Sequence, residues 1–124
     1  MHATTQPRFA DRPAVKRGAY AILTAALLTV AVLEIADGGP LWQVFVFGAA
    51  PDLALFAGIG SGLAKGQLHP RAVPLYNALH RFAGPILLAL VPGLRLGALA
   101  WAIHIALDRS VGYTLRDRDG FQRP

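Results

Sequence analysis

The 124-residue chain contains no cysteine, and only 15% of its residues are charged. Without cysteine it can form neither disulfides nor thiolate metal sites. Soluble domains average about 25% charged residues, so the low value points to a lipid environment. The sequence also lacks an HExxH zinc motif and a GxSxG nucleophile elbow, which excludes two common hydrolase signatures. The length supports one domain.

Basic residues exceed acidic residues by five, but their positions argue against nucleic-acid binding. No basic stripe with interleaved aromatic residues appears. Lys and Arg instead flank the apolar segments, in the N-terminal tail, in the loop 65–71 and in the C-terminal tail. The other two loops hold only Arg95. By the positive-inside rule, this asymmetry places both termini in the cytoplasm, with the lipid bilayer as partner and no nucleic acid.

Four apolar runs organise the chain, and each is near the 20 residues that a helix needs to cross a hydrocarbon core of about 30 Å. None has the charged face of a soluble bundle helix. The predicted fold is therefore all-α: an integral membrane four-helix bundle of up-down topology with both termini cytoplasmic. The expected parts are a flexible N-tail (1–17), a membrane domain (18–113) with spans at about 18–36, 41–64, 72–91 and 94–110, and a polar C-tail (114–124).

Few ionisable side chains lie inside these spans, and several of them are expected at the same depth in the membrane. A charge in mid-bilayer costs at least about 2.5–3.5 kcal/mol, so such residues face the bundle interior and find partners. A rise of 1.5 Å per residue places one group of them about 9–15 Å from the cytoplasmic face. The group consists of Asp52, His80, His104 and Asp108. His104 and Asp108 share one helical face, and Pro51 predicts a kink beside Asp52.

Two imidazoles and two carboxylates suit a divalent ion such as zinc, manganese or iron, and an open coordination position would allow water activation. If the protein is an enzyme, these four residues make it a metal-dependent membrane hydrolase. A second hypothesis is a structural network in which Arg81 or Arg109 pairs with the carboxylates, while Asn77 and Tyr76 bind the histidines and Tyr113 adds support. A third is a proton relay. The residues leave all three open.

Several motifs together resemble a known family. They are PDLALFAG at 51–58, YNALH at 76–80, Pro85, HIALDRSVGY at 104–113 and GF at 120–121. The chain resembles, over about 41–121, the small bacterial membrane proteins grouped as domain of unknown function 4260. Their pattern is Pro-Asp-Leu, Tyr-Asn-x-x-His and His-x-x-x-Asp-Arg-x-x-Gly-Tyr. The resemblance implies four spans in the bacterial inner membrane and no assigned activity.

This chain departs from the family pattern near its C-terminus. Thr114 stands where the family has glycine, and Arg116 stands where it has lysine. The family's threonine-histidine pair is missing because the chain ends FQRP, and the loop 62–71 is extended. A site that used the tail histidine would be incomplete in this protein.

The sequence thus indicates a multi-pass membrane protein with a buried Asp/His site, for which a divalent metal is the leading hypothesis for a ligand. The alternative is a non-enzymatic subunit or scaffold whose buried charges form a hydrogen-bond and salt-bridge network. Glycines at 58, 60 and 62 provide the small residues on which membrane helices pack closely. They favour a homo-oligomer or a place within a larger membrane complex.

Overall fold

The computed structural model describes residues 8–123, and this part of the chain is helical with no β-strand. The one β-bridge within residues 8–123 is isolated and joins Arg116 to Gln122. The all-α prediction is therefore confirmed for the described range. The expectation of a flexible tail over 1–17 falls partly on residues 1–7, which lie outside that range.

The first long element is α1 (Pro13–Ala36), which follows the short helix η1 (Phe9–Asp11). Pro13 suits a first helical turn, because its fixed φ is already helical and no N–H is needed there. The helix consequently begins before the span expected at Gly18. Its 24 residues make it, among residues 8–123, the one helix long and apolar enough to cross a membrane. That length corresponds to about 36 Å.

A tight turn after α1 carries the chain back toward the next helix. Gly38 adopts a φ of +90°. The N–H of Gly39 donates to the Glu34 carbonyl over 2.8 Å. A Cβ on Gly39 would lie 2.8 Å from that same oxygen, so the turn requires glycine. The Glu34 side chain pairs with Arg95, which joins this end of α1 to the last helix.

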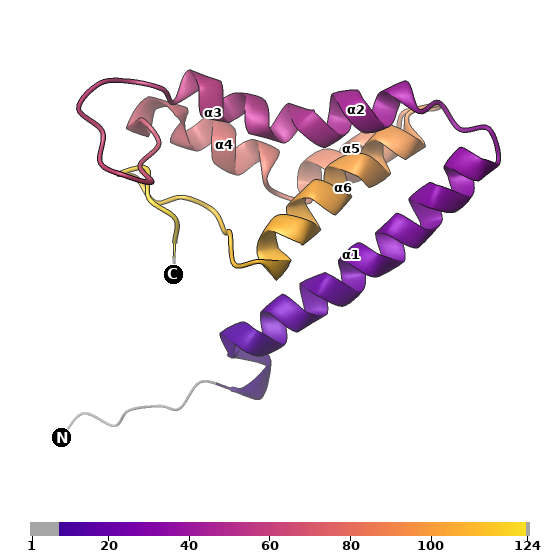
Figure 1. Cartoon of the computed structure of the whole chain (residues 1–124), viewed down its shortest axis with the longest axis horizontal. Coiled ribbons are helices and arrows are strands. Elements are labelled where there is room, and N and C mark those ends of the chain that lie inside the picture. Colours follow the sequence, from indigo (N-terminus) through magenta and orange to yellow (C-terminus); the bar gives the residue numbers. More distant parts are fainter. Residues whose placement is uncertain (1–7, 124) are drawn as a thin grey trace.

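The second apolar run forms a bent rod of α2 (Trp42–Ala49), η2 (Ala50–Asp52) and α3 (Leu53–Ala57) (Figure 1). Pro51 has no N–H to donate, and the α-helix gives way to a 3-10 turn there, as predicted. The rod ends at Ala57, before the expected limit at residue 64. Leu68 packs directly on Gly58, where a Cβ would lie 1.9 Å from the Leu68 Cδ1.

The third run is divided into two short helices. After η3 (Pro70–Ala72), α4 (Val73–Leu79) stops just before His80, and α5 (Ala83–Ala89) begins three residues after that histidine. Trp101 lies in this break, with its indole N–H donating to the Leu79 carbonyl over 2.8 Å. Its ring lies so close to Gly84 that a Cβ there would be 2.5 Å away.

The last helix, α6 (Arg95–Ser110), is the centre of the molecule and packs against α1, α2 and α5 (Figure 1). Buried Gln43 ties α2 to the start of α6: its amide donates to the Gly93 carbonyl over 2.7 Å and accepts from the Gly97 N–H over 2.9 Å. Gly97 also lets Phe47 approach, since a Cβ there would lie 2.4 Å from the ring. The helix that carries His104 and Asp108 is therefore held firmly at its start.

The C-terminal segment is folded back onto α4 and the loop before it. Asn77 makes two hydrogen bonds to the Arg116 backbone, of 2.9 and 2.8 Å. The Leu68 N–H donates to the Gly120 carbonyl, and Gly120 lies against the Leu68 backbone with a φ of +97°. The expected polar C-tail is thus an ordered part of the fold as far as residue 123.

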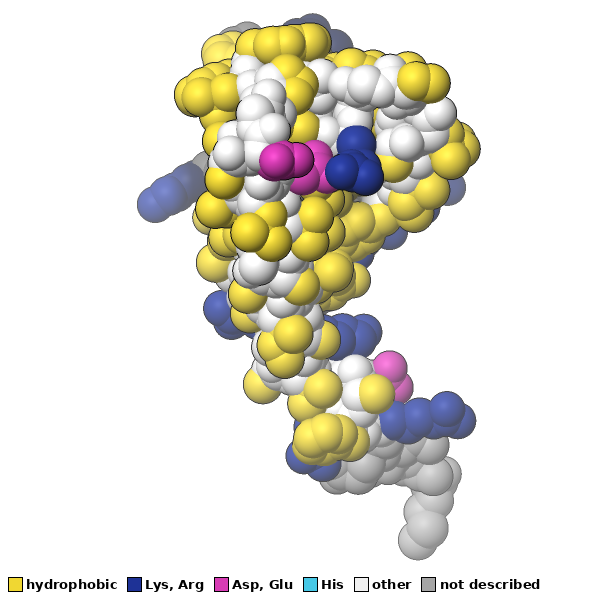
Figure 2. Space-filling view, turned by 90° about the vertical axis from the view of Figure 1, so that its right-hand side faces the viewer, with side chains coloured by type: hydrophobic (Ala, Val, Ile, Leu, Met, Phe, Trp, Pro, Cys, Tyr) yellow, Lys and Arg dark blue, Asp and Glu magenta, His cyan; other side chains and the backbone are white. Residues whose placement is uncertain are grey.

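Apolar side chains cover much of the outside of the molecule. Figure 2 shows hydrophobic side chains over most of one face, with acidic and basic groups side by side in one patch of its upper part. The exposed large hydrophobic residues come from several elements and include Ile22, Leu33, Phe45, Phe56 and Leu90. Exposed apolar surface of this extent is typical of faces that contact a membrane or another protein.

Candidate functional site

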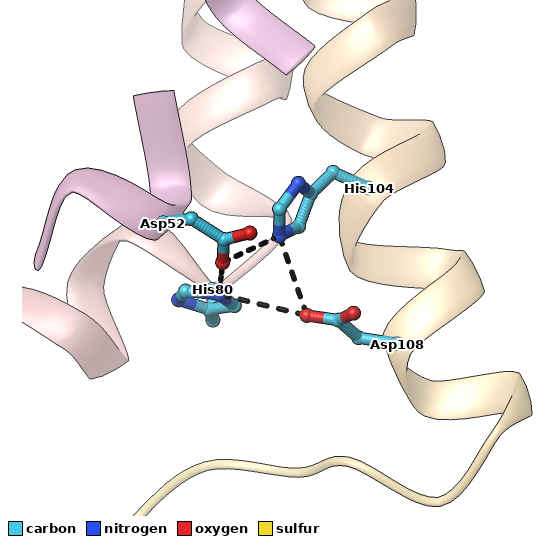
Figure 3. A group of neighbouring side chains, drawn as sticks. All are labelled: Asp52, His80, His104 and Asp108. Atoms are coloured by element: carbon cyan, nitrogen blue, oxygen red, sulfur yellow. Dashed lines mark ion pairs between the residues drawn. The ribbon is translucent and has the colours of Figure 1, made fainter. Parts of the chain in front are cut away.

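Four side chains from three segments meet around one point (Figure 3). The Nε2 atom of His104 lies 3.1 Å from Asp52 Oδ1 and 3.3 Å from Asp108 Oδ2. The Nε2 atom of His80 lies 3.7 and 3.6 Å from the same two oxygens. One ligand atom from each residue falls within 4.8 Å of all the others. The sequence-based expectation that these four residues form one Asp/His cluster is confirmed.

The local fold places each member of the cluster. Asp52 closes the 3-10 turn that Pro51 imposes, and His80 follows the last residue of α4. His104 and Asp108 lie one turn apart on α6, where residues four apart share a face. Two of the four side chains therefore come from α6, and the other two come from breaks in the helices that pack near it.

Both imidazole rings are oriented by backbone carbonyls. His80 Nδ1 lies 2.7 Å from the Tyr76 carbonyl, and His104 Nδ1 lies 2.7 Å from the Gly48 carbonyl. A carbonyl oxygen only accepts hydrogen bonds, so each Nδ1 carries a proton. In a neutral ring, Nε2 then has a free lone pair. Both lone pairs are directed into the cluster, toward the two carboxylates.

The contacts inside the cluster are ill suited to hydrogen bonding. Both Nε2 atoms are buried and have no hydrogen-bond partner among residues 8–123. The His80 distances exceed the usual 2.7–3.2 Å range. The two His104 contacts, of 3.1 and 3.3 Å, are shorter and become ion pairs when the ring carries both protons. An unprotonated Nε2 that faces a carboxylate is repelled by it, so either a proton on Nε2 or a metal ion between the two would stabilise the arrangement.

The separations between nitrogen and oxygen atoms in the cluster are close to those between metal ligands. In a tetrahedral zinc site with bonds of about 2.1 Å, neighbouring ligand atoms lie about 3.4 Å apart. The four nitrogen-to-oxygen distances of the cluster range from 3.1 to 3.7 Å. Carbonyls that accept from the opposite ring nitrogen are the usual outer partners of metal-bound histidine. The four residues can therefore hold one divalent ion.

The cluster is closed on the histidine side and open on the carboxylate side. The side chains of His80 and His104 are only 5% and 13% exposed. Asp108 is 29% exposed and Asp52 is 52% exposed. A small molecule can thus approach the cluster beside Asp52.

His80 is the first member of a stack of three side chains, in which Tyr76 lies between His80 and Arg116. The His80 and Tyr76 rings are stacked, with centroids 3.9 Å apart. The Arg116 guanidinium covers the Tyr76 ring at 4.8 Å, and Gln122 donates to the Tyr76 hydroxyl over 3.3 Å. The C-terminal segment thereby fixes the position of one member of the cluster.

The structural-network hypothesis pairs the cluster carboxylates with Arg81 or Arg109, and neither pair occurs among residues 8–123. Arg109 points away from Asp108, and its guanidinium donates to the Tyr20 hydroxyl and to the His80 carbonyl. Adjacent helix residues project about 100° apart, so Arg109 cannot share the face of Asp108. Arg81 is exposed and forms no ion pair in this range.

The other expected supporting residues have different roles from those predicted. The Asn77 side chain binds the Arg116 backbone and, in the described residues, hydrogen-bonds neither histidine; only its backbone carbonyl accepts from the His80 N–H, over 3.3 Å. Tyr76 does bind His80, but through its carbonyl and its ring. Tyr113 is 55% exposed and bonds Asp108 only through the backbone.

Sequence reasoning missed two residues that orient the site. Gly48 supplies the carbonyl for His104, and Tyr20 on α1 holds Arg109. Pro51 is the signal for the first: a proline removes an N–H donor and leaves carbonyls one turn earlier in need of another donor. For Tyr20 the sequence offers no such signal, because its position near a span end equally suits an interface anchor.

Comparison with known proteins gives one match. Neither a curated protein nor a solved structure matches the chain. The family described as Domain of unknown function (DUF4260) matches residues 16–124, a range that includes all four members of the cluster. This match covers most of the chain and confirms the resemblance seen in its motifs. The chain therefore belongs to the DUF4260 family.

Proposed function

We propose that the protein is a multi-pass protein of the bacterial inner membrane that binds one divalent metal ion. The ligands are Asp52, His80, His104 and Asp108, and the ion is zinc, manganese or iron. The observation that carries the proposal is the pair of buried Nε2 atoms that face two carboxylates at distances of 3.1 to 3.7 Å. Such a donor set of nitrogen and oxygen atoms is typical of these metals.

Membrane insertion in four spans is supported by how the helix breaks are satisfied. Non-helical backbone at membrane depth is tolerated where protein groups bind its free carbonyls. The carbonyls of Gly48, Tyr76, Leu79 and His80 all accept from side chains of the protein. The short helices α4 and α5 can therefore form one interrupted span, while α1 is long enough to span alone. Both termini are then cytoplasmic, as the distribution of Lys and Arg requires.

The reaction class that best suits this site is metal-assisted hydrolysis. Four protein ligands fill a tetrahedral site, so an open position would require five or more ligands, as manganese and iron accept and as zinc reaches by expanding its shell. An ion held in that way would polarise a substrate oxygen and activate water at neutral pH. The half-exposed Asp52 marks the side from which substrate and water would reach the ion. The buried histidine rings would hold the ion from one side, and substrate and water would reach it from the exposed side beside Asp52.

An apolar cavity supports a substrate with a hydrophobic part. The cavity has a volume of about 300 Å³, lies between α1 and α6, and reaches His104. Leu28, Val32 and Val44 are among the residues that line it. Its position beside the cluster would bring an apolar chain from the bilayer close to the proposed ion.

Elemental analysis of the purified protein tests the metal proposal. Wild-type protein prepared without chelators should contain about one zinc, manganese or iron ion per chain, and His104→Ala should contain almost none. His69→Ala is the matched control, because His69 lies in the loop before α4 and outside the cluster. Equal metal content in all three proteins, or none in any, would overturn the proposal in favour of a scaffold or subunit role.

A further inference from the structure

A second cavity lies on a different side of the molecule. It has a volume of about 540 Å³ and is bounded by the first turns of α1 and the end of α6. None of the four cluster residues lines it. Its polar wall consists of Asp11, Lys16, Arg17, Tyr20 and Arg109. The three basic groups against one acid give the cavity a positive charge.

The basic side chains are free to bind an anion. Among residues 8–123, neither Lys16 nor Arg17 forms an ion pair. Arg17 is held in place by one hydrogen bond, from its Nε to the Ser110 carbonyl at 3.0 Å. That bond leaves its two terminal nitrogens available as donors. Gly112, with a φ of +99°, lies beside the same guanidinium.

Arg109 forms the rigid wall of this cavity. Its guanidinium lies 5.5 Å from the ring centroids of Tyr20 and Phe82, which are stacked on each other. It also donates to the Tyr20 hydroxyl over 3.3 Å and to the His80 carbonyl over 3.0 Å. An arginine fixed in this way presents its remaining donors without losing further side-chain entropy.

We infer that this basic cavity binds the phosphate of an anionic phospholipid headgroup. In the proposed topology it lies at the cytoplasmic surface, where basic pockets between membrane helices bind such headgroups. The apolar face of α1 continues from the cavity toward the bilayer, with Ile22 and Leu23 exposed. A lipid can therefore place its phosphate among the basic groups and its acyl chains along α1.

The inference rests on the membrane part of the proposed function and is independent of the metal. The phosphate must reach Lys16 and Arg17, which lie on α1. Neither residue makes an ion pair with the cluster in the described range. Replacing them should therefore change lipid binding and leave metal content as in wild type.

Native mass spectrometry of the full-length protein in detergent tests the inference, with phosphatidylglycerol and phosphatidylcholine supplied together. Wild type should retain phosphatidylglycerol selectively. The variant Lys16→Gln with Arg17→Gln should bind it about 30-fold more weakly, since each basic residue near a membrane surface contributes about fivefold. The control, Lys65→Gln with Arg118→Gln, loses the same charge from exposed positions outside the cavity and should bind as wild type.

Three outcomes would overturn the headgroup site. Equal retention of both lipids, or an equal loss in both double variants, would show that no specific pocket exists. Displacement of phosphatidylglycerol by millimolar inorganic phosphate would show a site for free phosphate. Alkaline carbonate extraction separates these results from failure of the membrane proposal. A chain that stays in the membrane but lacks selectivity contradicts only the headgroup site, whereas release from the membrane contradicts the membrane proposal itself.

Discussion

His80 and His104 each use one nitrogen for the fold and leave the other for the site. The Nδ1 atoms bind backbone carbonyls, and the Nε2 atoms face two carboxylates. An ion that binds only the folded protein stabilises it, by about 2.7 kcal/mol at a free concentration 100 times its dissociation constant. We expect zinc at that excess to raise the thermal midpoint of wild type in detergent and to leave that of His80→Ala unchanged. An equal rise in both proteins would contradict His80 as a ligand.

Trp101 has the opposite role, because its polar atom is used wholly for structure. Its indole N–H donates to the Leu79 carbonyl at the end of α4. Trp101→Phe would leave that carbonyl without its donor, at a cost of about 1–3 kcal/mol in unfolding free energy. Trp42→Phe is the control, since Trp42 is 56% exposed and should change stability by no more than about 0.5 kcal/mol. Equal thermal midpoints for the two variants would refute this role.

At the residue scale, the sequence predicts which side chains lie at the same level, but it does not predict the hydrogen-bond partner of each one. Depth along the helices brought Asp52 to the level of His104 and Asp108, because the rise per residue is fixed. Rotation around the helix was harder to predict. Arg109 follows Asp108 directly, yet it binds Tyr20 on another helix. Such contacts depend on the tertiary packing of α1 on α6, which no local pattern encodes.

At the scale of elements, the packing of α2 on α6 depends on one small residue. Phe47 lies against Gly97, where a Cβ would be 2.4 Å from the ring. Gly97→Ala should lower stability by about 1–3 kcal/mol, because the ring must move in a packed interface. Gly18→Ala on α1 meets no atom within 4 Å and should stabilise the helix by up to about 1 kcal/mol. Unfolding in detergent measures both changes, and a neutral Gly97→Ala would show that the interface is loose.

The helix limits show where a hydrophobicity pattern fails as a guide to structure. The run 72–91 is mostly apolar and long enough for one span, but a helix break at His80 divides it into α4 and α5. The side chains of Trp101 and Arg109, both on α6, bind the carbonyls at the break and make it stable. Hydrophobicity predicts that a segment is buried or in lipid, whereas the continuity of its helix depends on partners far away in sequence.

At the scale of the whole molecule, the proposed topology has a consequence that the composition makes easy to test. Because the chain has no cysteine, a single introduced cysteine is the only thiol available for labelling. The four-span order places Asp37 and Pro92 outside the cytoplasm, and Lys65 and Arg118 inside. A membrane-impermeant maleimide added to intact spheroplasts should therefore label Asp37→Cys and Pro92→Cys. It should label Lys65→Cys and Arg118→Cys only after the membrane is permeabilised.

Each labelling result bears on a different crossing. Labelling of Lys65→Cys in intact spheroplasts would show that the bent rod α2–α3 does not cross, since Asp37 would then lie on the same side. Protection of Pro92→Cys would show the same for the divided run of α4 and α5, which is the least regular of the proposed spans. Labelling of Arg118→Cys would place the C-terminus outside and leave α6 without a crossing. The asymmetry of Lys and Arg favours the four-span result, because a cytoplasmic loop 65–71 and cytoplasmic tails keep most of the basic residues on one side.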